Sequence, residues 1–340
     1  MAHDRVCFAK KYKQQYIMDN NDLRQLIQKE TGELIIPDSV HFIKGHSFDG
    51  CSDLKHVQIP NSVREIYEYA FRGCTGLSKI ELPDSVTYLD EGAFEGCSGL
   101  KSIRLSNSLS EMESSVFAGC KELVSIEFPD SVRDIGFWTF KGCTKLKNIT
   151  LPKSITHIGP SFFEGCEELV SIEIPNSVKS ISRYAFMDCK KLKSIALPES
   201  LERIEDQAFE GCEELESIVI PDSVKHIGPR AFLYCKKLRS IVIPNSVTTI
   251  CGLAFGSCEE LTSITLPNSV TDIVERAFAD CTGLESIEIP NSVKRIGRGA
   301  FEGCVNLERV VLHNSNVVIE QGAFEGCDKL HIIKVWEGRQ

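Results

Sequence analysis

The sequence predicts an elongated α/β solenoid in which coils of 23 residues stack on one another. A cysteine recurs every 23 residues without an insertion, thirteen times from Cys51 to Cys327. A phenylalanine precedes each of these cysteines by three positions, and a serine follows by eleven positions in every complete repeat. A fixed period of about 20 to 50 residues is typical of chains whose units pack only on their neighbours. We therefore expect a single solenoid over residues 34–340, with about thirteen repeats.

Residues 1–33 lie outside the repeat and are expected to cap it. Asn20, Asn21 or Asp22 can begin a short helix, and Gly32 can end it. The apolar face of this helix would consist of Leu23, Leu26 and Ile27. Because a solenoid needs its first coil covered, we interpret this segment as a cap and not as a separate functional helix.

Each repeat is expected to begin with one short strand. Ile103 and Leu105 alternate with Ser102 and Arg104, which is the period of a half-buried strand. A proline follows this strand in eleven repeats. Since proline cannot donate a backbone hydrogen bond, it marks the point where pairing between strands stops. The strand is therefore expected to be brief, with Ile103 and Leu105 in the core.

The second half of each repeat is expected to hold a turn and then a compact apolar segment. Ser62, like the serine at its position in other repeats, can bond nearby backbone and support the turn. Further on, Ala70, Phe71 and Cys74 stand at the spacing of one helical or 3₁₀ turn. The residue before the cysteine is usually glycine, but Tyr234 replaces it in one repeat. Because tyrosine resists a positive φ, no left-handed conformation is expected there.

The cysteines favour buried thiols over disulfides. The chain has 15 cysteines, and thirteen of them hold one position of the repeat. The odd count and the absence of a C-x-x-C pair are not typical of a disulfide framework or a zinc site. Side chains in register point in parallel into the core, where a free cysteine behaves as a small hydrophobe. Cys7 and Cys251 lie outside the column, and we expect them to be the more reactive thiols.

The repeated phrase L-x-x-V-x-I-P-x-S-V-x-x-I-x-x-x-A-F-x-G-C, seen at residues 54–74, resembles the BspA-type leucine-rich repeat. The resemblance covers about residues 34–335. It implies a right-handed leucine-rich-repeat solenoid with a parallel β-sheet on its concave face and short strands, turns, 3₁₀ or helical turns on its convex face. It also implies binding and not catalysis, since such repeats are typical of surface proteins of bacteria and parasitic protists that adhere to host or neighbouring-cell proteins.

Composition and motifs exclude several other functions. The formal net charge of −10, without a block of Lys and Arg, disfavours nucleic acid and anionic membranes as partners. No apolar run reaches the 18 residues that a membrane-spanning helix needs. The zinc-protease, phosphate-loop and hydrolase motifs are absent, and His157 and His226 stand three repeats apart, too far for one metal ion. We therefore expect no enzyme activity, no cofactor and no metal.

The exposed positions of the first strands are the candidate site for a protein partner. Seven residues after the cysteine, acidic residues flank three successive apolar ones, and five residues after it the central repeats carry small serines. An apolar centre within a polar rim is typical of a protein interface. Strand propensity alone is an equally good explanation, because Ser, Thr and Val are common on exposed strands. The candidate residues are Glu173, Ser194, Ala196, Ser217, Val219, Ser240, Val242 and Glu288.

Charges directly after the cysteine alternate in sign from repeat to repeat. If these positions stack, each pair meets opposite charge in the neighbouring coil, which favours register and solubility. The alternative is that these charges form a stripe that binds a partner. Because opposite charges in neighbouring coils neutralise one another, the long-range electric field of such a stripe would be weak. The series is Glu167 and Glu168, Lys190 and Lys191, Glu213 and Glu214, Lys236 and Lys237, Glu259 and Glu260.

Two locations remain open from the sequence. Residues 1–11 contain no apolar run that would form a signal peptide. The family resemblance implies a secreted or cell-surface protein, whereas the many thiols suit a reducing, cytoplasmic compartment and an intracellular protein-interaction scaffold.

Overall fold

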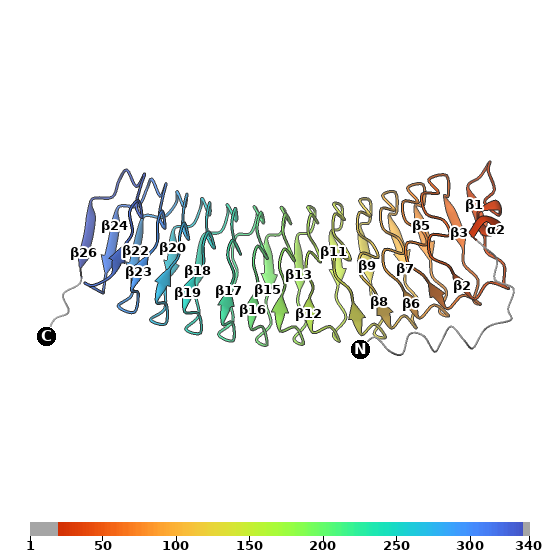
Figure 1. Ribbon diagram of the computed structural model, residues 1–340, viewed down its shortest axis with the longest axis horizontal. Coiled ribbons are helices and arrows are strands. Elements are labelled where there is room, and N and C mark those ends of the chain that lie inside the picture. The colour runs from red at the N-terminus through yellow and green to blue at the C-terminus, as the bar shows by residue number, and fades with distance from the viewer. Residues whose placement is uncertain (1–19, 336–340) are drawn as a thin grey trace.

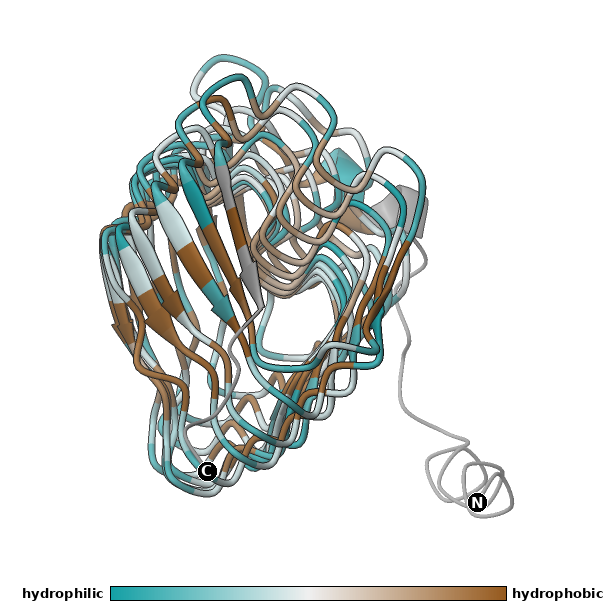
Figure 2. Cartoon of the chain, turned by 90° about the vertical axis from the view of Figure 1, so that its left-hand side faces the viewer, coloured by the Kyte–Doolittle hydropathy of each residue, from teal (hydrophilic) through white to brown (hydrophobic). Residues whose placement is uncertain are grey.

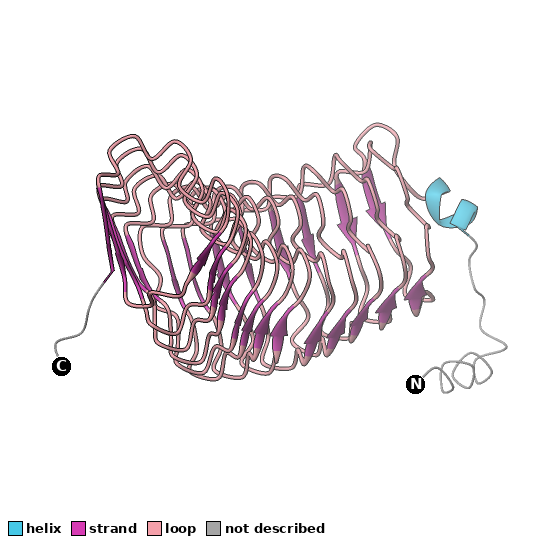
Figure 3. Cartoon of the chain, turned by 60° about the vertical axis from the view of Figure 1, so that its left-hand side comes forward, coloured by secondary structure: helices cyan, strands magenta, loops and turns pink. Residues whose placement is uncertain are grey.

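The computed structural model of the protein describes residues 20–335 as one elongated, gently curved stack of coils (Figure 1). Viewed along the stack, each coil is a loop with its first strand on one side (Figure 2). Short strands cross the coils and are joined by turns, and the helix α2 lies at one end (Figure 3). The predicted solenoid with parallel strands is confirmed. Among the described residues α2 is the sole helix, so turns replace the helical or 3₁₀ segments that we allowed for.

The first strands carry the predicted alternation of exposed and buried residues. Ile103 and Leu105 are buried, whereas Ser102 and Arg104 are exposed. Parallel pairing joins equivalent residues 23 apart, for example Ser171 with Ser194. The first strands are β1 (Glu33–Ile35), β3 (His56–Gln58), β5 (Lys79–Glu81), β7 (Ser102–Arg104), β9 (Ser125–Glu127), β11 (Asn148–Thr150), β13 (Ser171–Glu173), β15 (Ser194–Ala196), β18 (Ser240–Val242), β20 (Ser263–Thr265), β22 (Ser286–Ile289), β24 (Arg309–Leu312) and β26 (Ile332–Val335).

A second strand of two residues follows in each coil. These strands form parallel ladders of five, four and four members, interrupted between β10 and β12 and between β17 and β19. The second strands are β2 (Phe42–Ile43), β4 (Glu65–Ile66), β6 (Tyr88–Leu89), β8 (Glu111–Met112), β10 (Asp134–Ile135), β12 (His157–Ile158), β14 (Ser180–Ile181), β16 (Arg203–Ile204), β17 (His226–Ile227), β19 (Thr249–Ile250), β21 (Asp272–Ile273), β23 (Arg295–Ile296) and β25 (Val318–Ile319).

The helix α2 (Asn20–Gln25) packs on the first coil. Its Leu23 is fully buried in the core. Arg24 donates hydrogen bonds from its guanidinium to the carbonyl oxygens of His46 and Ser47, at 2.9 and 2.6 Å. The helix ends at Gln25, well before Gly32. Assignment of the whole segment 1–33 to a cap stays a prediction, since residues 1–19, with Cys7, lie outside the described part of the chain.

The core is a column of stacked phenylalanine rings with a column of thiols beside it. Successive rings lie 5.0 to 5.9 Å apart, and Phe186 and Phe209 are nearly parallel at 5°. Each repeat thiol from Cys74 to Cys327 donates a hydrogen bond to the carbonyl oxygen of the phenylalanine 26 residues earlier, at 3.0 to 3.3 Å. The thiols therefore act as hydrogen-bond donors between coils, a role that the sequence did not predict.

All fourteen described cysteines are free, and eleven of them are buried. Burial raises the pKa of Cys143 and of Cys281 to about 12. Cys251 is half-buried, and burial raises its pKa as well. The repeat thiols Cys235 and Cys258 are more deeply buried and their pKa values are raised as well, so the greater reactivity expected of Cys251 stays a prediction.

A column of serines fixes the turn between the two strands. Ser85 donates its hydroxyl to the carbonyl oxygen of Val63 at 2.6 Å, and Ser200 does the same to Val178 at 2.7 Å. In the last described coil Asn314 replaces this donor and bonds the carbonyl oxygen of Val293 at 2.7 Å. The recurrent serine is therefore a bond between coils and not only a support of its own turn.

The prediction that the residue before the cysteine avoids the left-handed region was wrong. Tyr234 has a φ of 62° and Asp188 of 57°, close to the 67° of Gly73. Each donates its backbone N–H to the next coil, Tyr234 to Gly256 at 3.0 Å and Asp188 to Glu210 at 2.8 Å. A side chain at Gly73 would meet nothing closer than 3.6 Å. The left-handed conformation costs a non-glycine residue about 1–2 kcal/mol. The hydrogen bond to the neighbouring coil offsets this cost, and the side chain has open space to occupy.

The alternating charges pair between coils as expected. Lys190 and Lys191 lie 2.7 and 2.6 Å from Glu167 and Glu168, one coil earlier. Lys236 and Lys237 likewise lie 3.3 and 2.8 Å from the two glutamates of the coil before them. The partners are exposed, so each pair contributes only about 0.2–1 kcal/mol, and mainly to register.

We expect the substitution Phe186→Ala to lower the free energy of unfolding by about 3–5 kcal/mol, because it removes a buried ring from a stack that cannot easily collapse. Circular dichroism during urea unfolding measures this loss. Val219→Ala, at an exposed position, is the control and should change stability by less than about 0.5 kcal/mol. Equal unfolding curves for Phe186→Ala and wild type would contradict the buried stack.

The buried thiols predict a loss of stability in alkali. Below about pH 9, Cys143 is protonated in both the folded and the unfolded state. Between about pH 9 and pH 12 the unfolded chain loses a proton that the folded chain keeps, so stability falls by about 1.4 kcal/mol per pH unit for this thiol. Cys143→Ala should therefore show a shallower fall of unfolding free energy between pH 9 and 10.5 than wild type. The same slope in both proteins would argue against a buried neutral thiol.

Candidate functional site

The candidate residues form one exposed strip across the first strands. We use the name first-strand strip for Glu173, Ser194, Ala196, Ser217, Val219, Ser240, Val242 and Glu288, all of which are exposed. Glu173 and Ala196 are register partners on β13 and β15, and Ser217 bridges to Ser240 on β18. The strip therefore brings seven of the eight residues together over four successive coils. Glu288 lies on β22, two coils beyond Val242.

The apolar centre of this strip faces solvent because its neighbours in the chain take the inward positions. Ile195, Ile218 and Ile241 are at most 6% exposed, whereas Val219 is 81% and Val242 66% exposed. In a strand of period two, these valines must point away from the core. The serine side chains on the same face are small, so they leave the valine side chains accessible to a partner.

One segment of the strip departs from the predicted strand. Residues 217–219 form only an isolated bridge with β18 and do not pair with β15. Their sequence S-I-V is as prone to form strands as that of neighbouring coils, so local propensity does not explain the loss. The segment nevertheless keeps the alternation, with Ile218 buried.

Acidic groups flank the apolar centre. Glu173 is exposed on β13, and Glu288 is exposed on β22. The Glu288 carboxylate lies 3.6 Å from the Nε2 atom of His313. The strip thus offers apolar and hydroxyl groups in its middle and negative charge at its margins.

One group of carboxylates and histidine comes close enough to bind a cation among the described residues. Ligand atoms of Glu205, Asp206 and His226 lie within 4.8 Å of one another. Both carboxylates already hold arginines, Arg203 at 2.6 Å from Glu205 and Arg183 at 3.0 Å from Asp206. A metal ion would have to displace these guanidinium groups. This group was not predicted from the sequence, although the 23-residue register pairs His226 with Arg203, two and three residues before the carboxylates.

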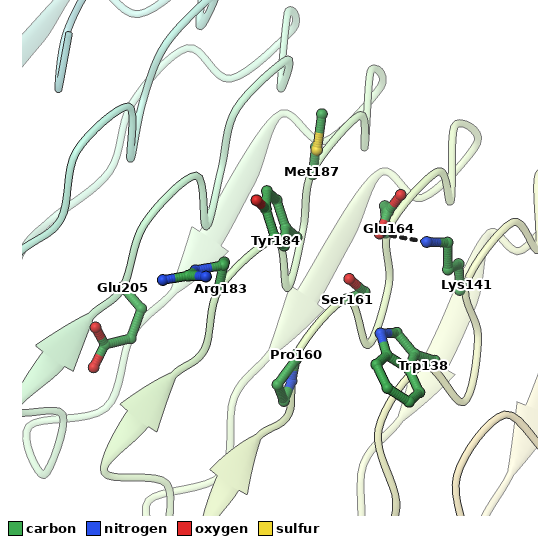
Figure 4. Close-up of a pocket in the computed structure, with 9 residues that line it drawn as sticks. All are labelled: Trp138, Lys141, Pro160, Ser161, Glu164, Arg183, Tyr184, Met187 and Glu205. Atoms are coloured by element: carbon green, nitrogen blue, oxygen red, sulfur yellow. Dashed lines mark ion pairs between the residues drawn. The ribbon is translucent and has the colours of Figure 1, made fainter.

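The turns also form a groove that the sequence did not predict. It has a volume of about 680 Å³ and is lined by Trp138, Pro160, Ser161, Tyr184 and Met187, with charged residues at its edges (Figure 4). Trp138 is 42% exposed. The signal in the sequence was weak, because the aromatic residues recur at this repeat position only in some coils.

Within residues 20–335 no helix has the length and apolar character needed to cross a membrane, since the sole helix there has six residues against the roughly 20 that a span requires.

The stacked coils with parallel short strands define a leucine-rich-repeat solenoid. The family model described as the BspA type leucine rich repeat region matches residues 27–143, 114–239 and 225–339. The chain therefore belongs to the BspA-type leucine-rich-repeat family. Leucine-rich-repeat proteins are generally protein-interaction modules and typically non-enzymatic.

Solved structures of bacterial proteins share the fold. A leucine-rich repeat protein from Bacteroides ovatus is 31% identical with a TM-score of 0.74, and the match covers 88% of this chain and 86% of that one. A leucine rich cell surface protein from Faecalibacterium prausnitzii is 28% identical with a TM-score of 0.58, over 91% and 88% of the two chains. A leucine-rich repeat protein from Eubacterium ventriosum, 24% identical with a TM-score of 0.60 over 88% and 91%, shows the fold alone. No curated protein matches the chain.

Proposed function

We propose that the protein is a non-catalytic recognition module that binds a protein partner through the first-strand strip. The observation that carries this proposal is the exposure of Val219 and Val242. Among the described residues they are the two most exposed large apolar side chains, and they stand on adjacent coils of one face. Exposed apolar groups that cluster on one face are typical of interaction sites.

The size of the strip limits the kind of contact. Three apolar residues on successive coils span only about 10 Å at ~4.8 Å per coil. Since a stable interface buries about 800 Å² on each partner, residues beyond the centre must take part, including Glu173 and Glu288. Their charge favours a partner with basic groups around an apolar anchor, and salt should weaken the association.

Adhesion at the cell surface is the role that we favour. It is supported by membership of the BspA-type family and by the similarity to a protein named as a leucine rich cell surface protein. The alternative is an intracellular protein-interaction scaffold, which is supported by the free thiols of all fourteen described cysteines, since thiols persist in reducing compartments. Protease shaving of intact cells, followed by immunoblotting, separates the two: loss of the protein supports the surface, and its survival until lysis supports the scaffold.

The double substitution Val219→Glu and Val242→Lys should weaken binding at least tenfold, because it places charge in the apolar centre. Both side chains point outward, so the melting curve should stay within about 2 °C of wild type. A partner is first isolated on the wild-type protein from extracts of neighbouring cells, and its affinity for each variant is then measured by biolayer interferometry.

The matched control is Val124→Glu with Val305→Lys, which changes two exposed valines that lie outside the strip. It should retain wild-type affinity. If the strip variant bound as tightly as this control, the first-strand strip would not be the binding site.

A further inference from the structure

We propose that the groove on the turns binds a proline-rich segment of another protein in the polyproline II conformation. This site is separate from the first-strand strip. Its two ends are Trp138 and Tyr184, and Ser161 lies between them (Figure 4). The three residues hold the same repeat position in successive coils.

The spacing of the two aromatic residues fits such a segment. Two coils at about 4.8 Å each separate Trp138 from Tyr184 by roughly 10 Å. A polyproline II helix advances about 9.3 Å in one turn of three residues, so prolines three apart would meet the two aromatic side chains in sequence. Ser161 is small and 3% exposed, so the coil between them leaves room for the peptide to cross. Aromatic-lined grooves are the usual receptors of proline-rich segments.

The backbone holds both aromatic residues in a strained but fixed conformation. Trp138 has a φ of 57° and Tyr184 of 62°, in the left-handed region that glycine occupies at no cost. Glycine does stand at this position in another coil, where Gly92 has a φ of 58°. Backbone N–H groups of Trp138 and Tyr184 donate to the next coil, to Pro160 at 3.1 Å and to Asp206 at 3.2 Å. The same left-handed φ recurs at this repeat position in other coils, for example at Leu253, so it is a feature of the fold. It fixes the backbone of both aromatic residues, and a fixed backbone reduces the entropy lost on binding.

The polar groups of the groove also suit an uncharged peptide. Lys141 and Glu164 form an ion pair of 3.0 Å at one edge, and Arg183 pairs with Asp206 at 3.0 Å near the other. Because these charges neutralise one another, the groove lacks the field that a strongly acidic or basic ligand would need. Within the described chain, no hydrogen bond engages the indole N–H of Trp138 or the hydroxyl of Tyr184. Both groups can donate to the exposed carbonyl oxygens of a polyproline II helix.

The test uses the full chain and a fluorescein-labelled decaproline peptide in fluorescence anisotropy. We expect saturable binding with a dissociation constant below about 1 mM, and no binding of a labelled Gly-Ser peptide of the same length. Trp138→Gly and Tyr184→Gly should each weaken binding about tenfold or more. Glycine removes the ring and relieves the backbone strain, so the melting temperature of both variants should equal or exceed that of wild type.

Leu253→Gly is the matched control, since Leu253 has the same repeat position and a φ of 55° but lies outside the groove. It should bind decaproline as wild type does. The proposal is overturned if decaproline does not bind to wild type at millimolar concentration, or if Trp138→Gly binds as tightly as Leu253→Gly. Neither outcome bears on the first-strand strip, whose residues are distant in the repeat.

Discussion

The register of 23 residues per coil is the constraint on which the rest of the structure depends. From Cys74 onward, the thiol of each repeat cysteine donates to the carbonyl oxygen of the phenylalanine one coil earlier, and the phenylalanine rings stack on one another. That carbonyl oxygen also accepts the backbone N–H of the cysteine three residues later in its own coil, as Phe71 does from Cys74 at 3.2 Å. One carbonyl oxygen therefore accepts a hydrogen bond from the turn of its own coil and another from the thiol of the next coil. An insertion would break this contact at the coil where it falls, because each coil contacts only its neighbours.

The same constraint explains what could be predicted from the sequence. The strand alternation at Ile103 and Leu105 follows from period two, and the buried rings follow from the fixed position of phenylalanine. The left-handed backbone at Tyr234 and the groove at Trp138 could not be predicted, because hydrogen bonds from the next coil impose them. Likewise, local preference does not account for the lost strand at residues 217–219, because the same sequence S-I-V forms a strand at residues 240–242. The sequence predicts the structure within a coil better than the features that depend on hydrogen bonds between coils.

A stack without insertions has no long loops from which to build a binding site, so recognition depends on side chains at repeated positions. Two such sets stand out on the molecule. The first-strand strip presents outward valines on a flat face, and the groove presents aromatic rings on a strained backbone. Changes at either set leave the core columns untouched. The fold can therefore hold its register while its surfaces change.

Deletion of whole and partial coils tests this account most directly. Removing residues 98–120, which is 23 residues, joins Cys97 to Lys121 and restores every column. Removing residues 98–119, which is 22 residues, leaves one coil of 24 residues between Cys97 and Cys143 and so breaks the columns at that coil. We expect the first protein to unfold cooperatively on heating with a melting temperature lowered by only a few degrees, and the second to melt at a clearly lower temperature than the first. Equal melting behaviour of the two deletions, measured by circular dichroism, would contradict a structure governed by register.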